Sequence, residues 1–275
     1  MITSVAVAIA ERHAGRWGSS VYAGRPGATI IRNFAALRTS NAFVFFSGFV
    51  EPVIFLLAFG YGVGSLVGDI EVGGVTVPYA AYLAPALLAS SAMTGALLDS
   101  TFNVFFKMHF MRLYHAMLAT SLGPMDVALG EIGWAMLRGG AYAVGFMVVA
   151  LVFGLLTSWW SLLMIPAAVL VAFAFASVGM TLTSYMKSFQ QLNWVQFWLL
   201  PMLLFSGTFF PITSYPAWLQ AIITVTPLWQ AIAMMRGLAL GMLDLGLLVH
   251  VLYFAVFVVV GLVITTRRLN ALFLR

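Results

Sequence analysis

Long runs of apolar residues, separated by short polar segments, fill most of this chain. A helix needs about 20 consecutive apolar residues to cross a bilayer, so each long run predicts one transmembrane span. Six spans are predicted, the fourth entered through the turn Thr157–Trp160: Asn41–Val67, Tyr79–Phe106, Asp126–Leu156, a span ending near Met186, Asn193–Phe210 and Gly246–Thr265. The pattern indicates an all-α polytopic membrane protein with six transmembrane helices.

An amphipathic segment precedes the first span. Residues 28–40 carry four apolar side chains at helical spacing: Ile30, Ile31, Phe34 and Leu37. Arg32 falls on the other side of this helix. Such a pattern is typical of a helix that lies in the membrane interface, so we predict an N-terminal interfacial helix at the inner surface.

Prolines interrupt the apolar sequence between the fifth and sixth spans. Pro211, Pro216 and Pro227 divide it into pieces too short to cross a bilayer. Broken backbone at membrane depth must be buried in protein or line a wet cavity. We therefore predict a re-entrant helical hairpin over Pro211–Arg236 that closes the outer end of a pathway. Arg236 would lie at the outer interface, and two tryptophans, Trp218 and Trp229, would act as interfacial anchors. Anchoring without gating is the alternative.

The positions of Lys and Arg predict the orientation in the membrane. Eleven of the thirteen basic residues fall in segments that become cytoplasmic if the N-terminus is inside. Both termini are therefore predicted to be cytoplasmic. Residues 1–27 are predicted to be a cytoplasmic leader, not a signal peptide, because the apolar run Ile2–Ala10 precedes its charges. Residues 28–275 then form one transmembrane domain.

Composition narrows the possible functions. The chain is 63% hydrophobic and 8% charged, whereas soluble domains carry about 25% charged residues. The net charge of +5 does not indicate a nucleic-acid partner, because the basic residues lie where a membrane protein places them. The chain has no cysteine, no Gly-x-x-x-x-Gly-Lys-Ser/Thr phosphate loop and no His-Glu-x-x-His motif. We expect no cofactor, metal site or catalytic residue on this chain.

The predicted spans are mostly apolar but contain a few charged residues. Glu51 and Arg138 each lie ten or so residues into a span, and at 1.5 Å rise per residue both fall near mid-membrane. We predict that they form a buried ion pair. Glu131 also lies deep in a span, and Asp99 lies near the inner end of one. Because intramembrane charges often serve function, an ion-coupled carrier is an alternative to a structural pair.

Several sequence blocks resemble the permeases of type-2 ATP-binding-cassette (ABC-2) exporters, in the branch typified by nodulation lipo-oligosaccharide export. The blocks are Glu51–Gly64, Tyr82–Met93, Tyr114–Thr120, Gly130-Glu131, Trp134, Arg138-Gly139, Phe205–Pro211, Tyr215–Gln220, Pro227–Gln230 and Arg236-Gly237. They follow the expected order over residues 28–270. The chain departs from the pattern at His115 and Ser121, where Asp and Pro are expected, and at Trp229-Gln230, where Thr-His is frequent.

The resemblance implies a half-transporter. Two permeases, identical or paralogous, would form the pore, and two separate nucleotide-binding subunits would bind ATP and magnesium below them. The connector Lys107–Pro124 would dock onto an ATPase as a coupling helix. Its candidate coupling residues are Phe110, Arg112, Leu113, Tyr114, Met117 and Leu118. A helix that lies flat on lipid is the alternative interpretation of this connector.

The resemblance also implies a substrate path between two permeases, lined by the second and fifth spans. The candidate residues are Ser90, Ser91, Met93 and Thr94 on the second span, with Asn193, Gln196, Phe197, Phe205 and Thr208 on and after the fifth. This mixture of aromatic, methionine and small polar side chains suits an amphiphile with an apolar tail and a polar head.

The predicted function is that of a permease subunit which exports a lipid-linked saccharide, a lipid or a hydrophobic drug across a bacterial cytoplasmic membrane. ATP hydrolysis on partner chains would supply the energy. One alternative is an ion-coupled secondary transporter. The other is a membrane enzyme that acts on a lipid-linked sugar, although the serines at Ser90-Ser91 and Ser206 have no histidine arranged to activate them.

Overall fold

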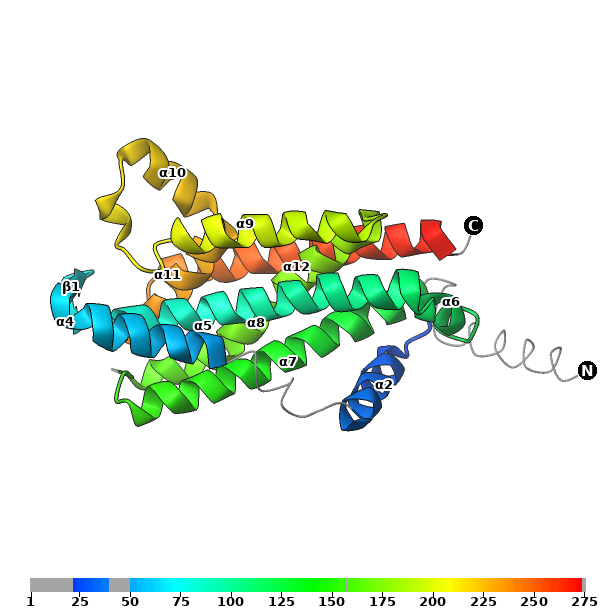
Figure 1. The fold of residues 1–275 in the computed structure, drawn as a ribbon, viewed down its shortest axis with the longest axis horizontal. Coiled ribbons are helices and arrows are strands. Elements are labelled where there is room, and N and C mark those ends of the chain that lie inside the picture. The colour runs from blue at the N-terminus through cyan, green and yellow to red at the C-terminus, as the bar shows by residue number, and fades with distance from the viewer. Residues whose placement is uncertain (1–21, 40–49, 157, 274–275) are drawn as a thin grey trace, which may run out of the picture.

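The computed structural model describes residues 22–39, 50–156 and 158–273, and the side chains of residues 37–39 and 273 are not described. Most of the predicted leader and the first part of the predicted first span, residues 41–49, lie outside the described residues. The described chain forms a bundle of long helices (Figure 1). It is an all-α polytopic membrane protein, as predicted.

In the part of the chain that the structure describes, five helices are long and apolar enough to cross a membrane. They are Val50–Val67, with η1 (Leu56–Val63) and α4 (Gly64–Val67); Tyr79–Phe110, with α5 (Tyr79–Leu98), η2 (Asp99–Asn103) and η3 (Phe106–Phe110); α7 (Pro124–Val152); Trp159–Tyr185, with η4 (Trp159–Leu163) and α8 (Met164–Tyr185); and α12 (Leu245–Phe273). The second span runs four residues past its predicted end at Phe106, which shortens the connector that follows.

Shorter elements join and flank these spans. They are α2 (Pro26–Thr39), α6 (Leu113–Leu118), η5 (Phe189–Gln191), α9 (Leu192–Leu204), η6 (Ile212–Ser214), α10 (Ala217–Val225) and α11 (Pro227–Leu240). The predicted interfacial helix corresponds to α2. The helices α10 and α11 are bent by 84° where they meet, so the apolar sequence is broken here as predicted.

The predicted fifth span is shorter than the sequence suggested. It ends at Leu204 and not at Phe210, so α9 has 13 residues and a length of about 20 Å. The chain leaves the helix at Phe205 and then turns at Gly207, whose backbone is left-handed with φ of 70°. The sixth candidate span is therefore the bent pair α10 and α11 rather than α9.

A small β-hairpin replaces the loop predicted between the first two spans. Strands β1 (Asp69–Val72) and β2 (Val75–Pro78) pair antiparallel, with Val72 opposite Val75. Gly73 and Gly74 form the two-residue turn with φ of 59° and 81°. Two glycines between alternating apolar residues are a strong hairpin signal, so the sequence contained this element.

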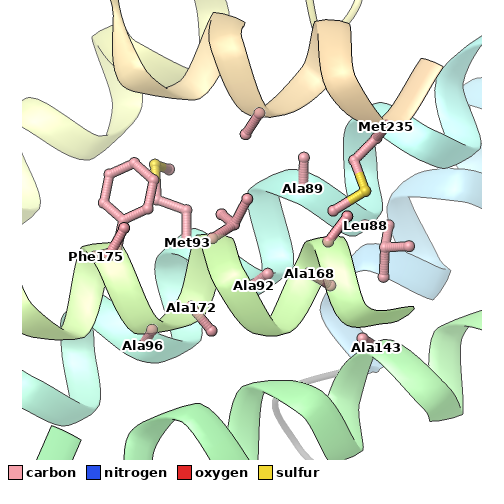
Figure 2. Close-up of a cluster of buried hydrophobic side chains, with 14 of the residues drawn as sticks. Leu88, Ala89, Ala92, Met93, Ala96, Ala143, Ala168, Ala172, Phe175 and Met235 are labelled. Atoms are coloured by element: carbon pink, nitrogen blue, oxygen red, sulfur yellow. The ribbon is translucent and has the colours of Figure 1, made fainter. Parts of the chain in front are cut away.

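The helix α5 forms the centre of the bundle. It packs against α7, α8 and α11, and the side chains at these contacts are mostly small (Figure 2). A methyl group at Gly139 on α7 would lie 2.7 Å from the Cβ atom of Ala172 on α8. Small residues at such contacts allow helix backbones to approach closely, which stabilises association in a membrane.

The two ends of the bundle differ in what they carry. The β-hairpin and α10 lie at one end, whereas α6 and the C-terminal end of α12 lie at the other (Figure 1). Arg267 and Arg268 are therefore at the same end as the predicted coupling connector. If the connector and the C-terminal segment are both cytoplasmic, as predicted, they must lie at the same end of the bundle. The orientation in the membrane stays a prediction.

Candidate functional site: a cavity between the spans and a polar connector

A cavity of about 350 Å³ lies among the first span, the second span and α7, with Leu203 of α9 at its edge. Its lining combines apolar and polar side chains. The polar ones are Glu51, Ser90, Ser91, Thr94, Asp99, Asn103, Arg138 and Tyr142. The cavity has the size and mixed character of a small-molecule site.

An ion pair forms one wall of this cavity. Arg138 Nη1 lies 2.7 Å from Asp99 Oδ1, and Arg138 Nε donates a hydrogen bond to Tyr142 Oη at 2.7 Å. Asn103 Nδ2 donates to the same Asp99 oxygen at 3.3 Å. The Asp99 carboxylate is therefore neutralised by Arg138 and held in position from two helices.

The predicted pairing of Glu51 with Arg138 is wrong. Glu51 is exposed and lines the same cavity, but the acidic partner of Arg138 is Asp99. Counting residues along two spans predicts depth in the membrane but not which helices are neighbours. The first span packs on α5, whereas α5 packs directly on α7, so Asp99 is the carboxylate that reaches Arg138.

The predicted substrate-path residues divide between separate surfaces. Ser90, Ser91 and Thr94 line the cavity, whereas Met93 points into the core beside Phe175 (Figure 2). The α9 residues Asn193, Gln196 and Phe197 are exposed on the outside of the bundle, as is Phe205. Thr208 is fully buried beyond the end of α9. Within one chain, the structure does not bring the candidates of the second and fifth spans together.

Two serine hydroxyls of these regions donate hydrogen bonds to backbone carbonyls four residues earlier in the chain. Ser90 Oγ donates to the carbonyl of Ala86 at 2.8 Å, and Ser206 Oγ donates to the carbonyl of Met202. Among the described residues, no group of three His, Asp or Glu side chains could hold a metal ion. Ser90 and Ser206 are therefore not arranged as nucleophiles.

The connector at the other end is anchored by some of its predicted coupling residues and exposes others. Tyr114 and Met117 of α6 are buried in the bundle, and Leu113 and Leu118 are half-buried. Phe110 is 66% exposed, and Arg112 is exposed in a left-handed conformation with φ of 47°. Burial raises the pKa of the Tyr114 phenol, and the nearby Glu131 carboxylate raises it further. Tyr114 is thus a neutral anchor and not part of a docking surface.

Glu131 of α7 is the centre of a buried polar cluster beside this connector. Its carboxylate lies 2.6 Å from Lys107 Nζ and 3.1 Å from Arg32 Nη2. Asn33 Nδ2 donates to Glu131 at 3.3 Å, and Lys107 Nζ donates to Asn33 Oδ1 at 3.2 Å. The cluster joins α2, the second span and α7. Sequence reasoning missed it because Lys107 was assigned to the connector and Arg32 to the interface.

A second carboxylate fixes the start of α2. Asp126 Oδ1 accepts a hydrogen bond from the backbone N–H of Arg25 at 2.7 Å, and Oδ2 accepts from Ala23 at 2.6 Å and from Gly123 at 2.9 Å. Asp126 is fully buried at the beginning of α7. The residues before α2 are therefore tied to the third span, so that α2, the connector and α7 share one attachment.

At the opposite end, side chains satisfy the backbone that follows α9. Arg236 Nη2 donates to the carbonyls of Gly207 at 2.7 Å and Thr208 at 3.2 Å. Tyr82 Oη donates to Gly207 O at 3.2 Å, and Tyr79 Oη donates to Phe209 O at 3.1 Å. These bonds meet the requirement that non-helical backbone at membrane depth find partners in the protein. The structure turns Arg236 onto these carbonyls, and not toward headgroups as the sequence suggested.

The two predicted tryptophan anchors of the hairpin have different surroundings. Trp218 is 67% exposed on α10, as an interfacial anchor would be. Trp229 is half-buried and lines a second cavity of about 260 Å³ with Arg236, Asp244 and His250. His250 Nδ1 is also hydrogen-bonded to Gln230 Oε1. Trp229 therefore packs within the protein, at the end of the bundle that carries the β-hairpin and α10.

Comparisons with known proteins agree with this architecture. The sequence pattern of the family described as "ABC-2 type transporter" matches residues 27–240. Two relatives called Nodulation protein J, from Rhizobium leguminosarum bv. viciae and bv. trifolii, are 31% and 33% identical over 246 residues, which are 89% of this chain and 93% and 92% of the relatives. "Inner membrane transport permease YadH" of Escherichia coli (strain K12) is 26% identical over 226 residues, 76% of this chain and 82% of that protein. No solved structure matches at a significant level.

Proposed function

Because this chain belongs to the ABC-2 type transporter family of membrane proteins, we propose that it is the permease subunit of an exporter driven by ATP hydrolysis on separate nucleotide-binding subunits. The chain itself is a multi-pass membrane permease. ATP and magnesium would bind to two partner ATPases, in the cytoplasmic membrane of a bacterium. The cargo would be an amphiphile such as a lipid-linked saccharide, a lipid or a hydrophobic drug.

One observation supports the ATPase partner most directly. The exposed end of the second span presents Phe110 and Met111, which are 66% and 68% exposed, beside the exposed Arg112. A few residues later, Tyr114 and Met117 anchor α6 in the bundle. An apolar and basic surface on a rigid support suits insertion into a groove of another protein. Force applied there would be transmitted to α7 and α2 through the Glu131 cluster.

A second permease would complete the translocation path. The exposed face of α9 carries large aromatic side chains, namely Trp194, Phe197 and Trp198, each more than 60% exposed. Contact between this face and another permease, identical or paralogous, would bring Asn193 and Gln196 into a shared cleft. The cavity lined by Ser90, Ser91 and Thr94 would then lie one helix away from that cleft.

The proposal is tested by purifying the tagged full-length chain in mild detergent from its native host and identifying the proteins that copurify. An ATP-binding-cassette ATPase is expected, and vanadate should abolish export. Replacing Phe110 and Met111 together by Asp should reduce ATPase recovery at least about tenfold. The matched control is Val75→Asp in the β-hairpin, an exposed apolar residue at the other end of the bundle.

Three results would contradict the proposal or a part of it. Vanadate-insensitive export that collapses with the ion gradient would assign the chain to the ion-coupled carriers. Unchanged ATPase recovery with the Phe110 and Met111 variant would place docking elsewhere on the chain. Activity on a lipid-linked sugar without any ATPase would favour the membrane enzyme.

A further inference from the structure

We propose that the intramembrane cavity binds the positively charged head of an amphiphilic organic cation, with the Glu51 carboxylate as its counter-charge. This inference is based on the cavity and the residues that line it. It rests on the proposed function in one respect, that the ligand is the exported cargo. Its volume of about 350 Å³ is near the lower limit of ordinary small-molecule sites, about 300–1,000 Å³. It therefore accommodates one compact organic ion or head group.

The charges around the cavity favour a cation. Asp99 and Arg138 neutralise each other at 2.7 Å. Among the residues that the structure describes, no Lys, Arg or His nitrogen lies within 4 Å of the Glu51 carboxylate. The lining thus carries one net negative charge. The Glu51 carboxylate lines a partly apolar cavity, so a bound monovalent cation stabilises it, whereas an anion would be repelled.

The uncharged lining leads to the same preference. The hydroxyl hydrogen of Ser90 is donated to the carbonyl of Ala86, so only the lone pairs of its oxygen remain for a ligand. Asn103 gives one of its two amide hydrogens to Asp99 and also carries a carbonyl oxygen that can accept. Phe55 and Phe102 supply aromatic surface, and aromatic faces attract cations that have lost their hydration shell. Oxygen acceptors and aromatic rings around one carboxylate are suited to an ammonium or phosphonium group with apolar substituents.

The test uses the full-length chain in lipid nanodiscs and two ions of the same shape but opposite charge, tetraphenylphosphonium and tetraphenylborate. Binding is measured by equilibrium dialysis, with partition into empty nanodiscs of the same lipid subtracted. We expect saturable binding of tetraphenylphosphonium and none of tetraphenylborate. Glu51→Gln should weaken binding of the cation at least about tenfold, and Glu51→Lys should reverse the preference toward the borate.

Two further variants make the result specific. Glu71→Gln removes an exposed carboxylate of the β-hairpin and should leave binding unchanged. Thr94→Leu fills part of the cavity without changing its charge and should also weaken binding. Thermal unfolding of each variant confirms that the fold is retained, and Thr94→Leu keeps the proposal testable if a change at Glu51 prevents folding. Equal binding of both ions, or full binding of the cation by Glu51→Gln, would overturn the proposal.

The origin of the cation is distinguished by the lipid. A lower affinity for tetraphenylphosphonium when phosphatidylethanolamine is added to phosphatidylglycerol nanodiscs would identify a lipid ammonium group as the natural occupant. Equal affinity for tetraphenylphosphonium in nanodiscs with and without phosphatidylethanolamine would identify the natural occupant as a cation that is not a lipid. Binding is measured without ATP, and ATPase copurification is scored separately, so failure of the cation site and failure of the exporter assignment give different results.

Discussion

The guanidinium of Arg236 lies 3.7 Å from the centroid of the Tyr82 ring, and both side chains donate hydrogen bonds to the carbonyl of Gly207. Gly207 follows α9 at the point where the predicted fifth span stops being helical. One carbonyl in broken backbone thus has two donors from two different helices, α5 and α11. This arrangement holds the segment after α9 against the centre of the bundle.

Arg236→Met should therefore destabilise the outer end of the protein. The substitution leaves the carbonyls of Gly207 and Thr208 short of donors, and each unsatisfied buried group costs about 1–3 kcal/mol. Tyr82→Phe keeps the ring and removes one donor, so it should cost about 1 kcal/mol. Thermal unfolding in detergent measures both. Equal, small effects of the two substitutions would show that Arg236 does not support this segment.

The ion pair between Asp99 and Arg138 gives a second prediction. Removing one partner of a buried pair costs about 3–5 kcal/mol, whereas removing both is better tolerated. Arg138 is partly exposed to the cavity, so we expect the low end of that range for Asp99→Asn and Arg138→Met. The double variant should lose less than the sum of the singles, and Glu51→Gln should not couple to Arg138→Met. Strictly additive losses would argue against the contact.

Glu131→Gln should weaken the attachment of α2 and the connector. The substitution leaves Lys107 as a buried cation without its counter-charge, and an unpaired buried charge is strongly destabilising. Adding Lys107→Met to Glu131→Gln should restore part of the lost stability. Thermal unfolding, together with limited proteolysis in the segment around α2, measures both effects. No recovery in the double variant would show that the cluster acts through Arg32 alone.

The buried phenol of Tyr114 predicts a dependence on alkaline pH. Its pKa is raised in the folded protein, so the phenol keeps its proton in the folded state at a pH where the unfolded chain loses it, above about 10. Its contribution is fully present below that pH and is lost as the pH rises further. Tyr114→Phe should lose less stability than the wild type between neutral pH and pH about 11. If the stability of the wild type and of Tyr114→Phe fell in parallel as the pH rises, the burial of the Tyr114 phenol would be contradicted.

Sequence patterns predicted the helices well and their lateral arrangement poorly. Hydropathy reports which segments enter the membrane, because an apolar run of sufficient length has few other stable environments. It does not report which helices are neighbours, and so Glu51 was assigned a partner that Asp99 provides. The non-helical segment after α9 contains the left-handed Gly207, and its carbonyl is satisfied by donors from distant helices, which hydropathy does not report. The β-hairpin, in contrast, was encoded locally by Gly73-Gly74.

The orientation in the membrane gives the last prediction. The chain has no cysteine, so single cysteines can be placed at exposed positions at each end of the bundle. Ser214 lies exposed between α9 and α10, and Ala119 lies exposed after α6. With the N-terminus inside, an impermeant thiol reagent added to intact cells should label Ser214→Cys and leave Ala119→Cys unlabelled. Permeabilised cells should show labelling of both, which controls for accessibility. Labelling of Ala119→Cys in intact cells would place the connector outside and would exclude its contact with a cytoplasmic ATPase.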